Sequence, residues 1–497
     1  MNLNQRQSFR SGQEYLRSLL FLSPFILLFF ISLIQVFNLT IIQGDKYQTI
    51  AESNRIYQKT INPVRGFIYD HRGELLVENV VQRDLYVTPA YIENPNKTLL
   101  TLSDLLGLSF EGLESIYFSR ALKIKNYDSF PLVKSLNEEQ IAKVKVNIDL
   151  ISGVEVISSL KRYVLHDQTL AHIIGYVGDI SLVDIQNDNS LSEIKNSQIG
   201  KTGIEKEFDF ILRGKPGYQT QERDVKGKLV RVLDTEGAKD GENIYLSIDK
   251  SLQTHLFKLF KGRKGALVAL EPKTGLVRAL ISSPSYDPNI LNSIVDSTLV
   301  EKLFDNQDSP IFNRAISGQY PPASTLKPFV GLAAIENRVI SWEKKIRDNG
   351  KYFVEGDPRP YRGWKENGHG NVDMRKAIIE SSDVYFYNLA YDLTLSGIKP
   401  MLENFGFGKK TGLTPFESSG LLPDKKWKLG YKGDFWFKGD TINLGIGQGY
   451  ILSTPLQLAV AYSGLANKGI IYKPLFIQPS DEKTYKPEKI AHINLSD

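Results

Sequence analysis

The most constraining feature of this chain is a long uncharged stretch near its N-terminus. No charged residue occurs from Ser18 to Gly44, and the centre of the stretch, Leu19 to Leu39, is almost entirely apolar. About 20 apolar residues suffice to cross a bilayer as a helix, whereas the core of a signal peptide is shorter and precedes a small-residue cleavage site. A buried core helix is the alternative, and the length argues against it. The sequence therefore predicts one transmembrane helix over residues 19–41.

The charges before this stretch predict its orientation. Arg6, Arg10 and Arg17 precede it, and only Glu14 opposes them. Because positive residues next to a membrane span are retained in the cytoplasm, we expect residues 1–18 to be cytoplasmic. The large remainder of the chain should then lie on the other side of the membrane.

Length and composition narrow the possible functions. With 497 residues, the chain is long enough for two or three domains. Its net charge of +5 gives no reason to expect nucleic acid as a partner. It has no cysteine, which excludes disulfides and thiolate chemistry within the chain.

Hydrophobic patterning divides the rest of the chain into two parts. Residues 233–242 are polar and contain glycine, which favours a domain boundary, and we place it between residues 236 and 237. Before it, the pattern predicts a strand-turn-strand around 70–73, helices within 95–150, one helix through 204–211 and a strand over 219–233. After it, the pattern predicts a helix over 252–260 and a β-hairpin over 265–282.

A serine and a lysine three residues apart stand at the start of another predicted helix. Pro321 and Pro322 precede Ser324, and the apolar residues after Pro328 indicate that the helix is buried. Since residues at i and i+3 share a helix face, the amine of Lys327 can activate the hydroxyl of Ser324 as a nucleophile. Burial and the positive helix end both lower the pKa of such a lysine, and the N–H groups at the helix start favour an oxyanion. A chance Ser-x-x-Lys is the alternative, and the proline-rich approach and apolar helix argue against it.

A second polar pair follows downstream. Ser381 and Asp383 form a Ser-x-Asp pattern. Ser381 is a candidate to relay a proton to the leaving amine, and Asp383 a candidate to hold Lys327 or a substrate amide. Considered alone, the pair is as well explained by a helix cap.

These motifs together resemble the class B penicillin-binding proteins, specifically the elongation-type penicillin-binding protein 2. The resemblance runs from the apolar stretch to the last residue, and its most specific segments are PVRGFIYDHRGELL, GIEKEFDFILRGKPG, GALVALEPKTGLVRALISSPSYDPN, YPPASTLKP, GWKENGHG, SSDVYFY and FKGDTINLGIGQGYILSTPLQLA. It implies an α+β fold with three parts. These are the transmembrane helix, an elongated β-rich membrane-proximal dimerisation or pedestal domain over residues 42–236, and a transpeptidase domain over 237–497 with an antiparallel sheet flanked by helices.

The resemblance also implies the activity. Members of the family are D,D-transpeptidases that cross-link the D-Ala-D-Ala stem peptides of peptidoglycan during cell elongation, through an acyl-serine intermediate, and they bind β-lactams. They are anchored in the inner membrane, face the periplasm and work with a SEDS-type glycosyltransferase. The family nucleophile corresponds to Ser324, its lysine to Lys327 and its second-motif pair to Ser381 and Asp383.

Two departures from the family pattern are visible. The third motif, lysine followed by threonine or serine and then glycine, is expected well beyond Gly447 to Tyr450, and the sequence stops at Asp497 before it. The triplets at 201–203, 273–275 and 410–412 do not correspond to it. We therefore expect a transpeptidase domain without its C-terminal strands, and slow or absent reaction with penicillin, because one lost oxyanion donor costs about 100- to 1,000-fold in rate.

The second departure concerns a zinc site that elongation-type members can carry. Its four positions correspond to Asp348, Gly363, His369 and Ser382, of which only Asp348 and His369 can ligate a metal. A closed tetrahedral site needs four ligands. We therefore expect no zinc and no other cofactor, with a structural role for His369.

Two other functions remain as alternatives to the enzyme. One is a catalytically inactive, membrane-anchored scaffold that activates the glycosyltransferase. The other is a β-lactamase or β-lactam sensor. The membrane-proximal domain argues against it, because a β-lactamase does not need one.

Overall fold

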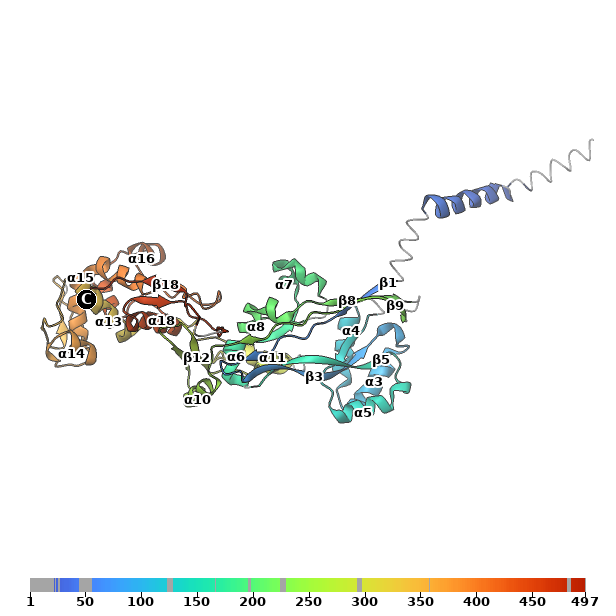
Figure 1. Cartoon of the computed structure of the whole chain (residues 1–497), viewed down its shortest axis with the longest axis horizontal. Helices are drawn as coiled ribbons and strands as arrows, with labels where there is room; N and C mark the ends of the chain where they lie inside the picture. The colour runs from blue at the N-terminus through green and yellow to red at the C-terminus, as the bar shows by residue number, and fades with distance from the viewer. Residues whose placement is uncertain are drawn as a thin grey trace, which may run out of the picture. The chain divides into compact units, whose positions relative to one another are not determined.

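The computed structural model describes residues 22, 24–25, 27–43, 56–122, 128–165, 167–194, 198–223, 229–292, 297–356, 358–480 and 484–496. These residues fall into two compact units (Figure 1). The first comprises Met1–Asn62 and Lys215–Lys239, and the second comprises Pro63–Gly214 and Asp240–Asp497.

The first unit contains a helix and a three-stranded antiparallel sheet. Residues 27–37 are helical and continue into the π-helical turn η1 (Asn38–Ile42). The sheet has the order β1 (Ile56–Ile61), β8 (Gly217–Arg223) and β9 (Leu229–Glu236). Where the sequence suggested a single strand over 219–233, β8 and β9 form two paired strands.

The predicted membrane span lies only partly within the described residues. Residues 19–21, 23 and 26 are outside them, while the described helical residues 27–37 are exposed throughout. Over the residues that the structure describes, no helix reaches both the length and the apolar character that a bilayer crossing requires. The single span thus stays a prediction.

The second unit begins with a five-stranded sheet. Its order is β10 (Ile244–Tyr245), β2 (Ile68–Tyr69), β3 (Leu75–Val87) and β4 (Phe130–Val133), with β5 (Val154–Val164) also paired to β3. The turn predicted at residues 70–73 joins β2 to β3. The helices predicted within residues 95–150 are α3 (Pro95–Leu106), α4 (Phe110–Ala121) and α5 (Glu138–Val146). They enclose a separate apolar core with β4.

The helix predicted through 204–211 is two short helices. α8 (Gly203–Glu207) ends at Phe208, which has φ −110° and ψ 21°, and α9 (Asp209–Arg213) follows. The prediction was wrong because spacing of Ile204, Phe208 and Ile211 is equally compatible with one helix or with two consecutive turns. Other elements of this part are η2 (Pro89–Tyr91), η3 (Ile148–Leu150), α6 (Asp167–Ile174), β6 (Val177–Asp179), α7 (Leu182–Asn187), η4 (Asn189–Glu193) and β7 (Gln198–Gly200), with β6 paired to β7.

The remainder of the second unit is built on two antiparallel strand pairs and a helical cluster. β11 (Gly265–Leu270) pairs with β12 (Val277–Ser283), as the sequence predicts, and β17 (Ile470–Tyr472) pairs with β18 (Lys489–His492). α10 (Lys250–Phe260) packs on β12, and α18 (Pro455–Ala466) packs on β11. The other elements are α11 (Pro288–Asn292), α12 (Ser297–Phe304), η5 (Ala323–Leu326), α13 (Lys327–Glu336), β13 (Ile346–Asp348), β14 (Lys351–Tyr352), β15 (Tyr361–Arg362), β16 (Gly370–Val372), α14 (Met374–Ile379), α15 (Asp383–Asn404), α16 (Lys425–Lys432) and α17 (Lys438–Gly445).

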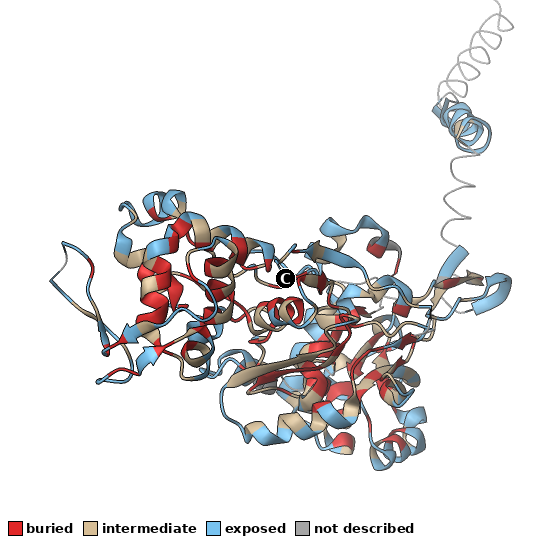
Figure 2. Ribbon diagram, turned by 60° about the vertical axis from the view of Figure 1, so that its left-hand side comes forward, coloured by how far each residue is buried: buried red, intermediate tan, exposed pale blue. Residues whose placement is uncertain are grey.

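The helical cluster is organised around α13 and α15. α13 packs against α15, and α15 against α17. Phe329 of α13 is fully buried, and its ring contacts the rings of Phe405, Phe407 and Tyr462 at 4.9 to 5.2 Å between centroids. Figure 2 shows the buried residues concentrated inside this unit. The apolar residues after Pro328 therefore anchor the start of α13, where Lys327 lies, and with it the preceding turn η5, which contains Ser324.

Candidate active site

Ser324 lies on a tight turn whose shape is fixed by a distant glycine segment. It belongs to the 3-10 turn η5, which continues directly into α13. The preceding residue, Ala323, has φ 50°, a left-handed conformation that residues other than glycine seldom adopt. Its N–H donates to the carbonyl of Gly447 at 2.9 Å. Gly447 has φ 70°, and a Cβ there would lie 2.1 Å from the carbonyl oxygen of Ala323, so only glycine fits.

The hydroxyl of Ser324 is linked to Lys327 through a third residue. The Oγ of Ser381 donates to the Oγ of Ser324 at 2.9 Å, and the Nζ of Lys327 donates to the Oγ of Ser381 at 3.0 Å. The i, i+3 spacing predicted the amine of Lys327 beside the hydroxyl of Ser324, and the hydrogen bonds connect the two groups through Ser381.

Lys327 is a buried amine at the base of the site. Ser324 is exposed, whereas Lys327 retains 1% of its accessible surface. Its Nζ donates to Asp383 Oδ1 at 2.6 Å and to the carbonyl of Ser381 at 2.9 Å. Burial lowers the pKa of Lys327 below its ordinary value, and this outweighs the attraction of Asp383, which raises it. The lysine is therefore more easily deprotonated than a surface lysine.

The second pair is held in place by Trp364. The N–H of Trp364 donates to Asp383 Oδ2 at 3.0 Å, and its indole Nε1 donates to the carbonyl of Ser381 at 3.1 Å. Ser381 has φ 54°, another left-handed residue that is not glycine. Asp383 is the first residue of α15. Trp364 was not among the predicted site residues, although it lies in the segment GWKENGHG that carries the family resemblance.

A buried hydrogen-bonded cluster lies behind this pair. Ser382 caps α15, accepting from the N–H of Tyr385, and its Oγ donates to Asp348 Oδ2 at 2.7 Å. His369 Nδ1 also contacts Asp348 Oδ2, at 2.7 Å. Although burial alone would raise the pKa of Asp348, the hydrogen bonds from Ser382 and His369 lower it.

The four positions of the family zinc site thus meet in space without offering four ligands. The N–H of Gly363 bonds to the carbonyl of Gly350, and Gly350 N–H donates to Asp348 Oδ1. Gly363 has no side chain, and the Oγ of Ser382 and Nδ1 of His369 are both engaged by one oxygen of Asp348. These donors do not fit a tetrahedral zinc ion.

The three triplets set aside in the sequence occupy turns. Lys201 to Gly203 leads into α8, and Lys273 to Gly275 joins β11 to β12. In the third, the Thr411 hydroxyl donates to Glu417 Oε2 at 2.7 Å. Each serves its local turn.

Comparison with known proteins identifies both parts of the chain. Residues 60–246 match the penicillin-binding protein dimerisation domain, and residues 265–496 match the penicillin-binding protein transpeptidase domain. The peptidoglycan D,D-transpeptidase MrdA of Haemophilus influenzae is 37% identical over 457 residues, which cover 91% of this chain and 70% of the relative. The enzyme of the same name from Escherichia coli strain K12 is 34% identical over 471 residues, covering 94% of this chain and 74% of the relative.

Solved structures agree with these relatives. A complex of penicillin-binding protein 2 with MreC from Helicobacter pylori superposes with a TM-score of 0.76 at 28% identity, covering 87% of this chain and 81% of that one. Penicillin-binding protein 2 of Pseudomonas aeruginosa superposes with a TM-score of 0.65 at 30% identity, covering 89% and 77%. The chain therefore belongs to the PBP2/MrdA family of penicillin-binding transpeptidases.

Proposed function

We propose that this protein is a peptidoglycan D,D-transpeptidase in which Ser324 is the nucleophile. The observation that carries the proposal is the chain of hydrogen bonds from Ser324 through Ser381 to the buried Lys327. An exposed hydroxyl connected to a buried amine of lowered pKa is the arrangement that general-base activation of a serine requires. This arrangement favours an enzyme over a scaffold, because a scaffold does not require an activated nucleophile.

The acylation step follows from these contacts. With Lys327 neutral, the two hydrogen bonds reverse, and the proton of Ser324 passes to Ser381 while that of Ser381 passes to the Nζ of Lys327. The Oγ of Ser324 then forms a bond to the carbonyl carbon of the penultimate D-Ala. The peptide C–N bond breaks, and the departing D-Ala amine takes a proton from the Lys327 and Ser381 pair. In η5 the N–H of Ala323 donates to the carbonyl of Gly447 and that of Thr325 to the carbonyl of Pro322, so the N–H of Ser324 is the group of this turn that would favour the transient oxyanion.

In the second half-reaction the same groups transfer protons in the reverse direction. The amine of a second stem peptide attacks the acyl-Ser324 ester and loses a proton to the pair. Breaking the ester C–O bond returns a proton to Ser324 Oγ. Asp383 holds Lys327 throughout, at 2.6 Å, so the amine stays in place whether it is charged or neutral.

The setting of the reaction is also part of the proposal. The uncharged stretch over residues 19–41 would anchor the chain in the inner membrane with residues 1–18 in the cytoplasm and the bulk in the periplasm. A SEDS-type glycosyltransferase would be its partner during elongation. Because the relative from Helicobacter pylori forms a complex with MreC, a protein of that kind is a second expected partner. Stem peptides and β-lactams would bind at Ser324.

We further propose that the enzyme works without zinc. His369 Nδ1 and Ser382 Oγ both bond to Asp348 Oδ2, and His369 Nε2 is buried without a hydrogen-bond partner. Asp348 and His369 are thus the two metal-binding side chains of the four, since Ser382 is a poor zinc ligand and Gly363 offers none. His369 then has a structural role beneath the Ser381 and Asp383 pair.

Covalent labelling by a fluorescent penicillin tests the nucleophile. Because slow reaction with penicillin is expected from the sequence, labelling is followed over a long incubation. We expect the slowly formed label on Ser324, complete loss of labelling in Ser324→Ala, and labelling slowed by a further factor of about 100 to 10,000 in Lys327→Ala because the general base is lost. Ser341→Ala changes an exposed serine of the same part of the chain and should be labelled like the unmodified protein. A label that persists in Ser324→Ala would contradict the assignment.

A further inference from the structure

We infer that an exposed surface beside the active site binds the glycan strand to which the stem peptides are attached. This inference rests on the proposed transpeptidase function. The surface is formed by α16 and the loop that leads to α17, and we call it the aromatic–lysine surface. It consists of Lys425, Lys426, Leu429, Tyr431, Lys432, Phe435, Phe437 and Lys438.

Large apolar side chains are unusually exposed there. Tyr431 is 73% exposed, Phe435 72% and Phe437 56%. The loop turns these rings outward because the residue between the two phenylalanines, Trp436, is held inward by a hydrogen bond from its Nε1 to Thr441 Oγ1 at 2.8 Å. Exposed apolar groups gathered on one face mark sites of interaction.

The charge of the surface is strongly one-sided. Over residues 425–438 the exposed charged side chains are four lysines and one carboxylate, that of Asp434. Asp434 is itself 3.5 Å from the buried amine of Lys428. The surface therefore attracts an anionic partner.

Lys428 fixes this surface to the glycine segment that shapes the nucleophile turn. Its amine is buried, lies 2.7 Å from Asp440 of α17, and stands over the rings of Phe437 and Tyr450 at 4.5 and 5.6 Å. Trp427 of α16 packs on Tyr450 with 5.3 Å between centroids. Tyr450 follows Gly447, whose carbonyl accepts from Ala323, by about 10 Å of chain at most. Lys428 and Trp427 thus connect the aromatic–lysine surface, through Tyr450, to the segment that shapes the nucleophile turn.

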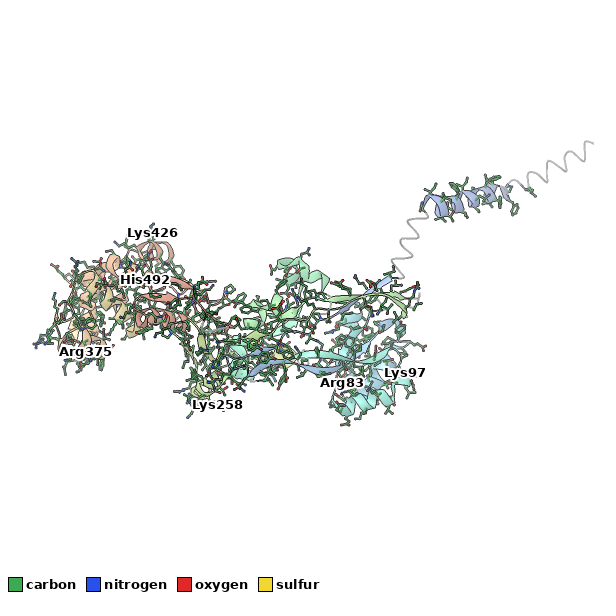
Figure 3. All side chains as sticks on the ribbon, in the orientation of Figure 1. Arg83, Lys97, Lys258, Arg375, Lys426 and His492 are labelled. Atoms are coloured by element: carbon green, nitrogen blue, oxygen red, sulfur yellow. The ribbon has the colours of Figure 1, made fainter. Side chains whose placement is uncertain are left out.

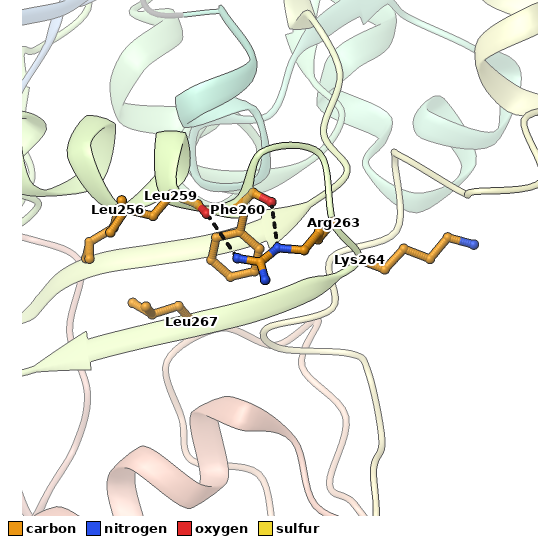
Figure 4. A pocket seen from close by; sticks show the side chains of 6 residues that line it. All are labelled: Leu256, Leu259, Phe260, Arg263, Lys264 and Leu267. Carbon is orange, nitrogen blue, oxygen red and sulfur yellow. Dashed lines mark hydrogen bonds between the residues drawn. The ribbon is translucent and has the colours of Figure 1, made fainter.

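A second basic and apolar surface of the same unit provides a contrast. At the end of α10, Leu256, Leu259, Phe260 and Leu267 line a small pocket with Arg263 and Lys264 (Figure 4). Arg263 is turned onto the helix end, donating to the carbonyls of Phe260 and Leu259, and Lys264 is paired with Asp308 at 2.7 Å. Figure 3 labels Lys258 on α10 and Lys426 on α16, which lie apart in the unit. Because its exposed basic groups are engaged locally, the α10 surface serves as a control.

A glycan strand with its stem peptides fits the chemistry of the aromatic–lysine surface. The faces of sugar rings present C–H groups that pack on the negative faces of aromatic rings. The carboxylates of the stem peptides supply the negative charge that lysines attract. Since one stem peptide must reach Ser324, the strand that carries it has to pass close to the site. Proximity to Tyr450 favours this occupant over a membrane surface.

Binding of soluble, uncross-linked peptidoglycan strands to the whole protein tests the inference. The variant is Tyr431→Ala with Phe435→Ala, and the control is Lys258→Ala with Leu259→Ala on α10. We expect the first to bind strands about tenfold more weakly, the factor that corresponds to about 1.4 kcal/mol, and the second to bind like the unmodified protein. Lys432→Ala should make binding less sensitive to salt, because fewer exposed charges remain to be screened. Thermal unfolding confirms that each variant is folded.

Three results would overturn the inference. In the first, the Tyr431 and Phe435 variant binds strands as tightly as the unmodified protein. In the second, free stem peptides compete fully with the strands. In the third, the variant keeps its affinity for strands and loses only its binding to vesicles of phosphatidylethanolamine and phosphatidylglycerol. Penicillin labelling separates this inference from the proposed function. Ser324→Ala should lose the label and keep its affinity for strands. If the unmodified protein takes no label even after prolonged incubation, the transpeptidase proposal fails, and the strand measurements still decide the role of the surface.

Discussion

At the scale of single residues, Ser381 is the centre of the site. Its Oγ contacts both Ser324 and Lys327, and its carbonyl accepts from Lys327 and from the indole of Trp364. Its φ of 54° costs on the order of 1–3 kcal/mol for a residue that is not glycine. The cap formed by Ser382 and the buried carboxylate of Asp348 hold the backbone in that conformation. The hydroxyl is therefore in position before any substrate arrives.

The pH dependence of acylation tests the balance of forces on Lys327. Acylation needs the neutral amine, so its rate falls as the pH drops through the pKa of Lys327. Burial lowers that pKa and Asp383 raises it. In Asp383→Asn the larger raising effect is lost and the weaker attraction of Asp348 remains. The acid limb of the rate profile should therefore move to lower pH, with a smaller maximum rate because the amine loses its anchor.

The measurement is the rate of penicillin acylation across pH. Asp392→Asn is the control, since it changes an exposed carboxylate on the same helix. An acid limb that moves to higher pH in Asp383→Asn would contradict the role given to Asp383.

Part of this residue-scale geometry was accessible from the sequence. Ser324 and Lys327 share a helix face by their spacing, and Ser381 and Asp383 follow from their motif. The position of Ser381 between Ser324 and Lys327 could not be predicted from the sequence, because it depends on a contact between residues 57 positions apart. From the sequence, Asp348, His369 and Ser382 were considered only as metal ligands, because sequence spacing does not reveal the hydrogen bonds among them.

At the scale of elements, two segments that carried the family resemblance meet in a buried ion cluster. Arg65, just before β2, donates to Glu205 Oε2 at 2.6 Å, and Arg162 of β5 donates to Glu205 Oε1 at 2.6 Å. Glu205 belongs to α8 and is 1% exposed. Burial alone would raise the pKa of Glu205, and the two guanidinium groups lower it. One carboxylate thus joins β2, β5 and α8.

Removing this carboxylate should strongly destabilise the second unit. Glu205→Gln removes the carboxylate paired with the buried guanidinium of Arg162, while Arg65 keeps Asp209 at 2.8 Å. A cost of about 3–5 kcal/mol is expected for breaking such a buried pair. Urea unfolding followed by tryptophan fluorescence and circular dichroism gives the free energy. Glu139→Gln removes an exposed carboxylate paired with Lys143 and should leave the midpoint unchanged. A Glu205→Gln protein as stable as the unmodified one would show that the cluster is neutral for stability.

The predicted elements are confirmed where the hydrophobic periodicity and the residues that end helices and strands agreed. The strand-turn-strand at 70–73, the helix over 252–260 and the hairpin over 265–282 are present. The helix predicted over 204–211 is interrupted at Phe208. Burial of Glu205 between two arginines depends on β5 and on Arg65, which lie far away in the sequence, so no local pattern could indicate it.

At the scale of the whole molecule, the polar stretch before Ile244 is tightly bonded rather than loose. Lys239 exchanges two backbone hydrogen bonds with Lys215, and the N–H of Gly241 donates to the carbonyl of Val64 at 2.9 Å. Gly241 also packs so closely that a Cβ would lie 1.8 Å from the carbonyl of Leu212. Polar, glycine-bearing composition suggested a boundary here, and that boundary stays a prediction. The composition could not show that the backbone groups find partners.

Limited proteolysis tests this arrangement. A protease needs an extended, unpaired backbone, so brief trypsin treatment of the native protein should leave the bond after Lys239 uncut. The same bond should be cleaved once the protein is unfolded in urea. Peptide mass mapping gives the answer, and rapid native cleavage after Lys239 would contradict the bonding described.

The parallel pairing of β2 with β10 has a consequence for how the protein is made. The hydrogen bond from Phe67 N–H to Asn243 Oδ1 and the neighbouring ladder join residues 176 positions apart. At about 5–20 residues per second of synthesis, β2 emerges roughly 10–35 s before its partner exists. During that interval β2 and β3 can form their hairpin, while the other edge of β2 remains open to wrong pairings. During this period, correct folding of the nascent chain depends on keeping the open edge of β2 from pairing with other strands.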